Sequence, residues 1–154
     1  MNEDYKKQTD LAKITKFILD FMFYSGILTC FALPLIITAI APFYDKFKIF
    51  YWQAVILYFI DGVLAVMLIN ELRKIFRTVL EDDCFIVKNV DSLRKMGNYS
   101  FAIMAVSAVR LVFYITPAIL VVILVFLIAG FFSKVLSQVF DKAVTYKLEN
   151  DLTI

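Results

Sequence analysis

The chain of 154 residues contains no histidine and only two cysteines. Without histidine it lacks the commonest general base, the commonest transition-metal ligand and the side chain that titrates nearest neutral pH. Cys30 lies in an apolar block and Cys84 in a polar segment, so the two thiols suggest neither a disulfide framework nor a paired metal site. The sequence also lacks a glycine-rich phosphate loop and a nucleophile elbow. We therefore expect a protein that is not an enzyme and that has no resident metal or cofactor.

Charge is scarce as well, since charged residues make up 19% of the sequence and the net charge is +2. This excess is too small to indicate a nucleic-acid surface. The basic residues instead lie beside apolar blocks, as the topology of a membrane protein requires. We expect the lipid bilayer to be the main partner and expect no direct binding of nucleic acid.

Apolar residues are abundant, at 62% of the chain against roughly 45–50% in soluble proteins. They form blocks of about 20 residues, the length of helix that crosses a hydrocarbon core of about 30 Å. The first block begins too late and runs too long for a cleaved signal, so we expect it to remain as a span. The sequence predicts an all-α, polytopic membrane protein with one domain and four transmembrane helices, over residues 18–41, 50–70, 99–115 and 118–132.

The last two spans come from one long apolar stretch between Tyr99 and Lys134, in which Arg110 is the only charged residue. More than 30 residues is too long for one ordinary span. Pro117 divides the stretch, because proline disfavours helix in the residue before it and suits the first turn of a new helix. The alternative is a single long helix with a kink at Pro117.

Two polar segments complete the chain, a central connector at residues 71–97 and a C-terminal segment at residues 133–154. The connector begins with apolar residues at helical spacing, so we expect an amphipathic juxtamembrane helix there. The C-terminal segment continues the last span as a second amphipathic helix. The residues that carry the first pattern are Leu72, Ile75, Phe76, Val79 and Leu80.

Orientation follows from the Lys and Arg residues in the short loops. Four lysines precede the first span, six Lys or Arg residues lie in the central connector, and three lysines follow the last span. The first connector holds only Lys46 and Lys48, and the turn at Thr116 and Pro117 holds none. Because cytoplasmic loops carry the excess of Lys and Arg, we expect both termini and the central connector to be cytoplasmic.

Two ionisable residues fall inside the predicted spans, and such residues are functional candidates by default. Asp61 lies about eleven residues into the second span, on one helical face with Tyr58 and Ala65. Arg110 lies near the outer end of the third span. If the two spans are antiparallel neighbours, the two α-carbons differ in depth by only about 8 Å along the membrane normal, at a rise of 1.5 Å per residue. An ion pair between Asp61 and Arg110 is therefore a candidate site.

This candidate has a functional and a structural interpretation. In the first, the pair couples ions or protons in a small transporter or senses a ligand. In the second, which we favour, the pair is merely neutralised, or Arg110 extends outward while Asp61 bonds to Tyr58. The sequence contains no clear polar pathway leading to Asp61. Asp20 lies near the cytoplasmic interface, four residues after Lys16, and we expect it to be an interfacial residue.

In residues 81–97 an acidic start is followed by Phe85 and Ile86, and the tail of residues 149–154 reads Glu-Asn-Asp-Leu-Thr-Ile. With these motifs the connector and the tail resemble a bacterial membrane family catalogued as domain of unknown function 2975. Cys84 stands where the family more often has proline. The connector residues that fit the family pattern are Phe85, Asn89, Leu93, Arg94 and Gly97.

The resemblance implies a four-span protein of the bacterial cell membrane with no assigned activity, often encoded beside a small helix-turn-helix regulator. Its motifs lie in the cytoplasmic segments and not in the spans. Our leading hypothesis is therefore a docking surface for a soluble regulator; a transporter or sensor using Asp61 and Arg110 is the alternative, and a homo-oligomer stays open. The candidate docking residues are Phe85, Asn89, Leu93, Arg94, Asn150, Asp151 and Leu152.

Overall fold

The computed structural model describes residues 3–43, 49–81, 83–113 and 115–151, and within them it contains helices and no strand. The α-helices are α1 (Glu3–Ile40), α3 (Tyr51–Leu80), α4 (Val87–Arg110) and α5 (Pro117–Asp151), and a short 3-10 helix, η1 (Ala41–Phe43), follows α1. The predicted all-α class is confirmed over this part of the chain.

Three of these helices are long and apolar enough to cross a membrane, namely α1, α3 and α5. This is the composition expected of an integral membrane protein. Helix α4 is shorter and more polar, with Lys88, Asp91, Arg94 and Lys95 in its first turns and Arg110 at its end. Its polar residues are the reason that it does not reach the hydropathy of the other three.

The division of the long apolar stretch at Pro117 is confirmed, because Pro117 is the first residue of α5. The alternative of one long kinked helix is wrong. Helix α4 ends at Arg110 rather than at residue 115. The backbone N–H groups of Leu111, Val112 and Phe113 donate to carbonyls three residues earlier, each at 3.1 Å. This tighter winding replaces the last turn because the chain must reverse before Pro117.

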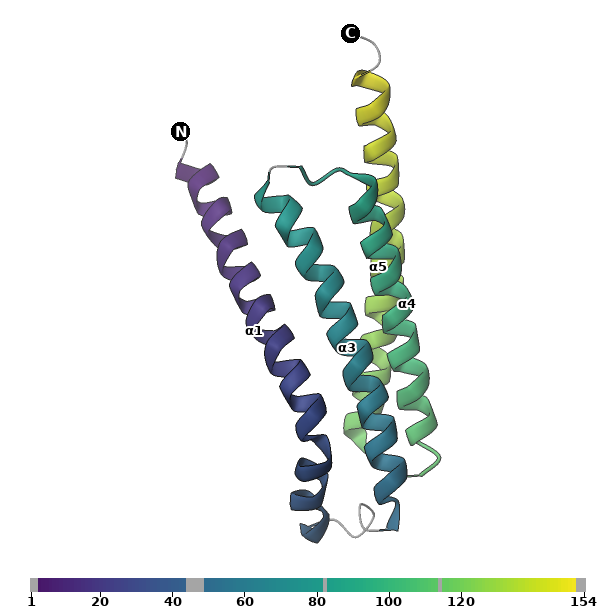
Figure 1. Cartoon of the computed structure of the whole chain (residues 1–154). Coiled ribbons are helices and arrows are strands. Elements are labelled where there is room, and N and C mark those ends of the chain that lie inside the picture. The colour runs from purple at the N-terminus through teal and green to yellow at the C-terminus, as the bar shows by residue number, and fades with distance from the viewer. Residues whose placement is uncertain (1–2, 44–48, 82, 114, 152–154) are drawn as a thin grey trace.

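The four helices run alternately up and down, so that both ends of the described chain lie at one end of the molecule (Figure 1). The connection between α3 and α4 lies at that same end, and η1 and the start of α5 lie at the other. Only residues 81–86 of the predicted connector fall outside α3 and α4. The predicted amphipathic helix at the start of the connector is the last part of α3.

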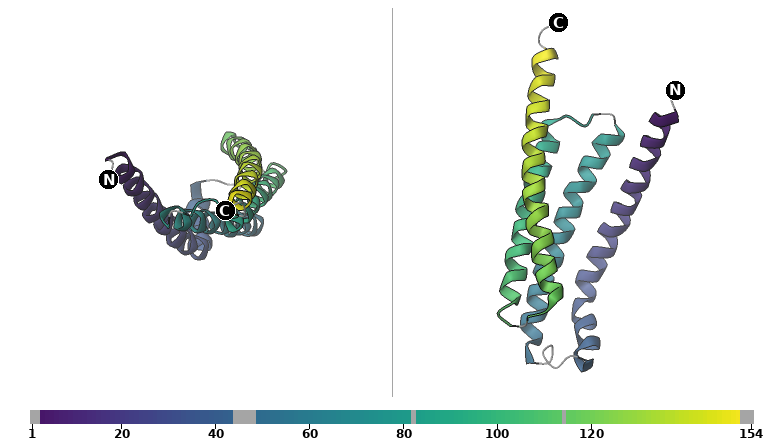
Figure 2. Two further views of the ribbon diagram at one scale, coloured as in Figure 1. Left: turned by 90° about the horizontal axis from the view of Figure 1, so that it is seen from above. Right: turned by 180° about the vertical axis from the view of Figure 1, so that it is seen from behind.

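The helices form an open arc rather than a closed bundle, as the view from above shows (Figure 2). Helix α1 packs along α3, α3 along α4, and α4 along α5. Among the described residues, no other pair of these helices makes an extended contact. The arc therefore has a concave side, bounded by α1 and α5.

Helix α4 is the best-buried helix, because α3 and α5 cover it from two sides. Seven of its ten buried positions recur in steps of four and three, the spacing of a helix that packs along its neighbours. Four of these seven are polar, so the buried face of α4 carries polar side chains, as helices in membranes do. The buried positions in this series are Asn89, Leu93, Met96, Ser100, Ile103, Ser107 and Arg110.

Glycines allow two of these helix pairs to approach closely. A Cβ atom on Gly130 of α5 would lie 2.7 Å from the ring of Phe101 on α4. A Cβ atom on Gly62 of α3 would lie 2.8 Å from the Sγ atom of Cys30 on α1. Since neither distance is sterically allowed, these two contacts depend on the absence of a side chain.

Candidate functional site

An ion pair joins α3 to α4 on the inner face of the arc. The Nη2 atom of Arg110 lies 2.8 Å from the Oδ2 atom of Asp61, and the two side chains are 5% and 13% exposed. The same Nη2 atom donates to the Oγ atom of Ser107 at 2.8 Å. Ser107 in turn donates to Oδ2 of Asp61 at 3.3 Å. The three polar groups form a closed triangle that holds the carboxylate against the guanidinium.

Tyr58 completes this cluster, one helical turn before Asp61 on α3. The guanidinium carbon of Arg110 lies 4.5 Å from the centre of the Tyr58 ring, within the range of a cation–π interaction. The structure thus brings together Tyr58, Asp61 and Arg110, the three residues of the predicted candidate site. Ser107 is an addition that sequence reasoning missed, although it lies three residues before Arg110 and therefore on its helical face.

Asp61 lies within α3, one of the helices that are long and apolar enough to cross a membrane, and its partner Arg110 is the last residue of α4. Asp61 follows Trp52 by nine residues on one continuous helix, which corresponds to about 14 Å along the axis. That is close to half of a hydrocarbon core of about 30 Å. An isolated charge at this depth is costly, so pairing of Asp61 with Arg110 is a condition for placing either residue there.

Two atoms of the cluster stay unsatisfied. The Oδ1 atom of Asp61 and the Nε atom of Arg110 are buried and have no hydrogen-bond partner among the described residues. Most buried polar atoms in proteins are satisfied, so each exception needs a reason. Here one acceptor and one donor of the same ion pair are left over, so the cluster keeps hydrogen-bonding capacity that the described residues do not use.

These two residues line a groove of about 560 Å³ on the concave side of the arc. Helix α1 contributes Ser25 and Thr29 to its lining, and α5 contributes Val122 and Phe126. The lining is mostly apolar, with its polar groups gathered around Asp61. Chemically, the groove can hold an amphipathic molecule with a small polar group. Among the described residues no group of three or more His, Cys, Asp or Glu side chains could hold a metal ion.

The predicted docking residues separate into two groups. Asn89 is buried, and its amide donates to the Thr78 hydroxyl and to the Cys84 carbonyl oxygen, each at 2.7 Å. Leu93 is buried in a core cluster with Ile75 and Met96. These two residues hold the connection between α3 and α4 in place, and a partner protein cannot contact them on this surface.

The other docking candidates lie on the surface. Phe85 is 47% exposed, and its ring packs against that of Phe140 on α5. The side chain of Arg94 is 55% exposed. Asn150 is exposed near the end of α5. Leu152 and the side chain of Asp151 lie outside the part that the structure describes.

Two polar contacts that the sequence did not reveal also hold the helices together. Arg73 of α3 donates to Asp20 of α1 at 2.5 Å. Glu71 is buried and accepts hydrogen bonds from Ser92 of α4 at 2.8 Å and from Lys74 at 2.6 Å. The partners in the contacts between helices are 21 to 53 residues apart, so no local pattern links them.

The family model described as Protein of unknown function (DUF2975) matches residues 8–154. Because this match covers nearly the whole chain, the protein belongs to that family, as the resemblance of its connector and tail predicts. No curated protein and no solved structure matches the chain.

The ion pair gives a prediction about stability. Asp61→Ala and Arg110→Ala should each destabilise the fold by about 3–5 kcal/mol, because each leaves an uncompensated buried charge. The double variant should lose clearly less than the sum of the two. Unfolding in mixed micelles measures all three values. The exposed pair of Asp91 and Arg94, 3.7 Å apart, is the control, and its coupling should be below about 1 kcal/mol. Additive losses at Asp61 and Arg110 would contradict the pairing.

Proposed function

We propose that this member of the DUF2975 family is a non-enzymatic protein of the bacterial cell membrane that docks a soluble cytoplasmic regulator, such as a helix-turn-helix protein. The family match itself carries no activity. The proposal rests instead on the shape and the charge of one end of the molecule.

The charged end supports the proposed orientation. The ends of the described chain and the connection from α3 to α4 lie together (Figure 1), and the segments at this end carry most of the Lys and Arg residues. By the positive-inside rule this is the cytoplasmic end. In the proposed topology α4 also crosses the bilayer. Its 24 residues extend about 36 Å, and it packs between two helices of spanning length.

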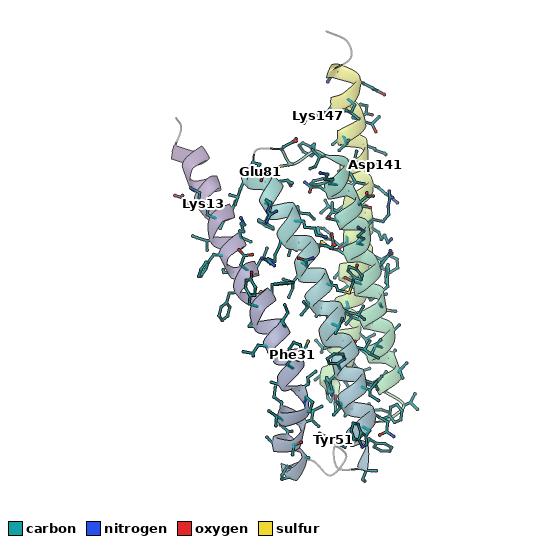
Figure 3. The ribbon with its side chains drawn as sticks, in the orientation of Figure 1. Lys13, Phe31, Tyr51, Glu81, Asp141 and Lys147 are labelled. Atoms are coloured by element: carbon teal, nitrogen blue, oxygen red, sulfur yellow. The ribbon has the colours of Figure 1, made fainter. Side chains whose placement is uncertain are left out.

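The observation that carries the proposal is the extension of α5 beyond its neighbours. Its 35 residues measure about 52 Å, about 20 Å more than a hydrocarbon core requires. Figure 3 shows Lys147 on this projecting part, above the level of Glu81, which follows the last residue of α3. The extension is fastened to the 81–86 segment by the Phe85–Phe140 contact and by an ion pair of Lys147 with Asp83 at 2.9 Å.

The extension presents apolar side chains where lipid would not cover them. Tyr146 and Leu148 are 66% and 54% exposed. Exposed apolar groups surrounded by polar ones are typical of protein interaction sites. The proposed docking surface consists of these side chains and of three further exposed residues at this end, Phe85, Arg94 and Asn150. Asn89 and Leu93 take no part in it, because they are buried.

The docking surface predicts which variants lose a partner. Full-length tagged protein, purified gently from native membranes, should retain a soluble protein in a stoichiometric amount. Deletion of residues 149–154 or the substitution Tyr146→Ala should abolish this retention, because each removes part of the proposed surface. Insertion into the membrane should not change. Quantitative mass spectrometry of the copurified proteins is the measurement.

Ile49→Ala provides a matched control, since Ile49 is 71% exposed but lies at the opposite end of the molecule. This variant should retain the partner at the wild-type level. If the wild type and the deletion yield the same proteins, the docking proposal is wrong.

A second candidate function, that of a small ion-coupled transporter or membrane sensor, is favoured by one observation. Asp61 and Arg110, each with one buried atom that lacks a hydrogen-bond partner among the described residues, line a groove open between α1 and α5. Such an intramembrane charge with room for a ligand is a common feature of coupling sites. In this function, the carboxylate of Asp61 would exchange its bond to Arg110 for one to a proton or a ligand.

Proton flux into proteoliposomes tests this second function. Asp61→Asn should remove the flux while the protein elutes as a folded species, because the amide cannot carry the proton. Asp61→Glu, which restores a carboxylate, should recover part of it, and Asp91→Asn on the exposed face of α4 should leave it unchanged. Full flux in folded Asp61→Asn would exclude proton coupling through this residue.

A further inference from the structure

A second pocket, of about 280 Å³, lies between α1 and α3 near the charged end of the molecule. The two helices diverge there (Figure 1). Its lining is basic, with four cationic side chains and one carboxylate. The lining residues are Lys16 and Asp20 from α1, and Asn70, Arg73, Lys74 and Arg77 from α3.

The depth of this pocket is set by the length of α3. Arg73 follows Trp52 by 21 residues on the same helix, or about 32 Å at 1.5 Å per residue. A hydrocarbon core is about 30 Å thick. Because tryptophan prefers the membrane interface, Trp52 marks one headgroup layer. The basic pocket then lies at the level of the opposite headgroup layer.

Some charges of the pocket are already engaged. The Nε atom of Arg73 binds Asp20, and its guanidinium carbon lies 4.3 Å from the ring centre of Phe23. Lys74 binds Glu71. The contacts of Arg73 fix the walls of the pocket, since they join α3 to α1 and hold Arg73 in one orientation.

Two charges are not engaged. Neither Lys16 of α1 nor Arg77 of α3 forms an ion pair with a carboxylate in the part of the chain that the structure describes. They line the pocket from opposite helices. An anion bound to both would offset part of their positive charge and would join the diverging ends of α1 and α3.

We propose that this pocket binds the phosphate group of an anionic phospholipid. The chemistry is that of a phosphate oxygen accepting hydrogen bonds from lysine and arginine. Basic pockets between transmembrane helices on the cytoplasmic side are suited to anionic headgroups. Phe17 and Phe21, which are 74% and 69% exposed on the adjoining turns of α1, offer apolar surface on which an acyl chain can lie.

Native mass spectrometry of the full-length chain with phosphatidylglycerol and phosphatidylcholine tests the proposal. The wild type should retain one phosphatidylglycerol in preference to phosphatidylcholine. The double variant Lys16→Gln with Arg77→Gln should bind phosphatidylglycerol roughly 30-fold more weakly, the change expected for two basic side chains near the headgroups. Its melting temperature should match the wild type, because neither residue has an ion pair to lose within the described chain.

The control removes two charges from the same end of the molecule but outside the pocket. Lys88 and Arg94 of α4 are exposed, and Lys88→Gln with Arg94→Gln should keep the preference for phosphatidylglycerol. Equal losses in the two double variants would overturn the proposal in favour of general surface charge. No lipid preference in the wild type would overturn it as well.

Competition with inorganic phosphate distinguishes a site for a lipid headgroup from a site for free phosphate. With a lipid site, millimolar phosphate should not displace bound phosphatidylglycerol, because it lacks the acyl chains that lie on the helices. The opposite result has three parts: phosphate alone binds to the wild type, it does not bind to the double variant of Lys16 and Arg77, and it prevents lipid binding. In that case the site takes free phosphate and the lipid assignment is wrong.

Discussion

The structure depends on one constraint, that polar side chains within an apolar environment must be satisfied by the chain itself. Helix α4 carries most of the buried polar side chains, and Asn89, Ser92 and Ser107 among them form hydrogen bonds with other residues of the chain. It therefore lies between α3 and α5, and its most costly residue, Arg110, pairs with Asp61 across the contact with α3. Helix α1, whose exposed surface is mainly apolar, needs only α3 as a neighbour, and this explains why the arc stays open.

The open arc separates three regions along one axis. The groove around Asp61 lies near the middle, the basic pocket around Arg73 lies at one headgroup layer, and the extension of α5 stands beyond it. One ion pair lies in each region: Asp61 with Arg110, Asp20 with Arg73, and Asp83 with Lys147.

Much of this arrangement follows from the sequence, since hydropathy predicts α1, α3 and α5, and Pro117 predicts where α5 begins. The depth of Asp61 and Arg110 predicts that they can meet. The burial of Asn89 and Leu93 was not predicted, because the charges around them obscure the apolar face of α4. The bond from Arg73 to Asp20 was not predicted either, since only the packing of α1 on α3 reveals it.

The central claim is that the polar helix α4 crosses the bilayer, with its two ends on opposite sides. Labelling of intact cells with a membrane-impermeant maleimide tests it, in a background in which Cys30 is serine. Cys84 lies just before α4 and should react only after permeabilisation. In a second variant, Cys84→Ser with Ile115→Cys, the remaining cysteine lies just after α4 and should react in intact cells. Reaction of both from the same side would show that α4 does not cross, and would contradict the account.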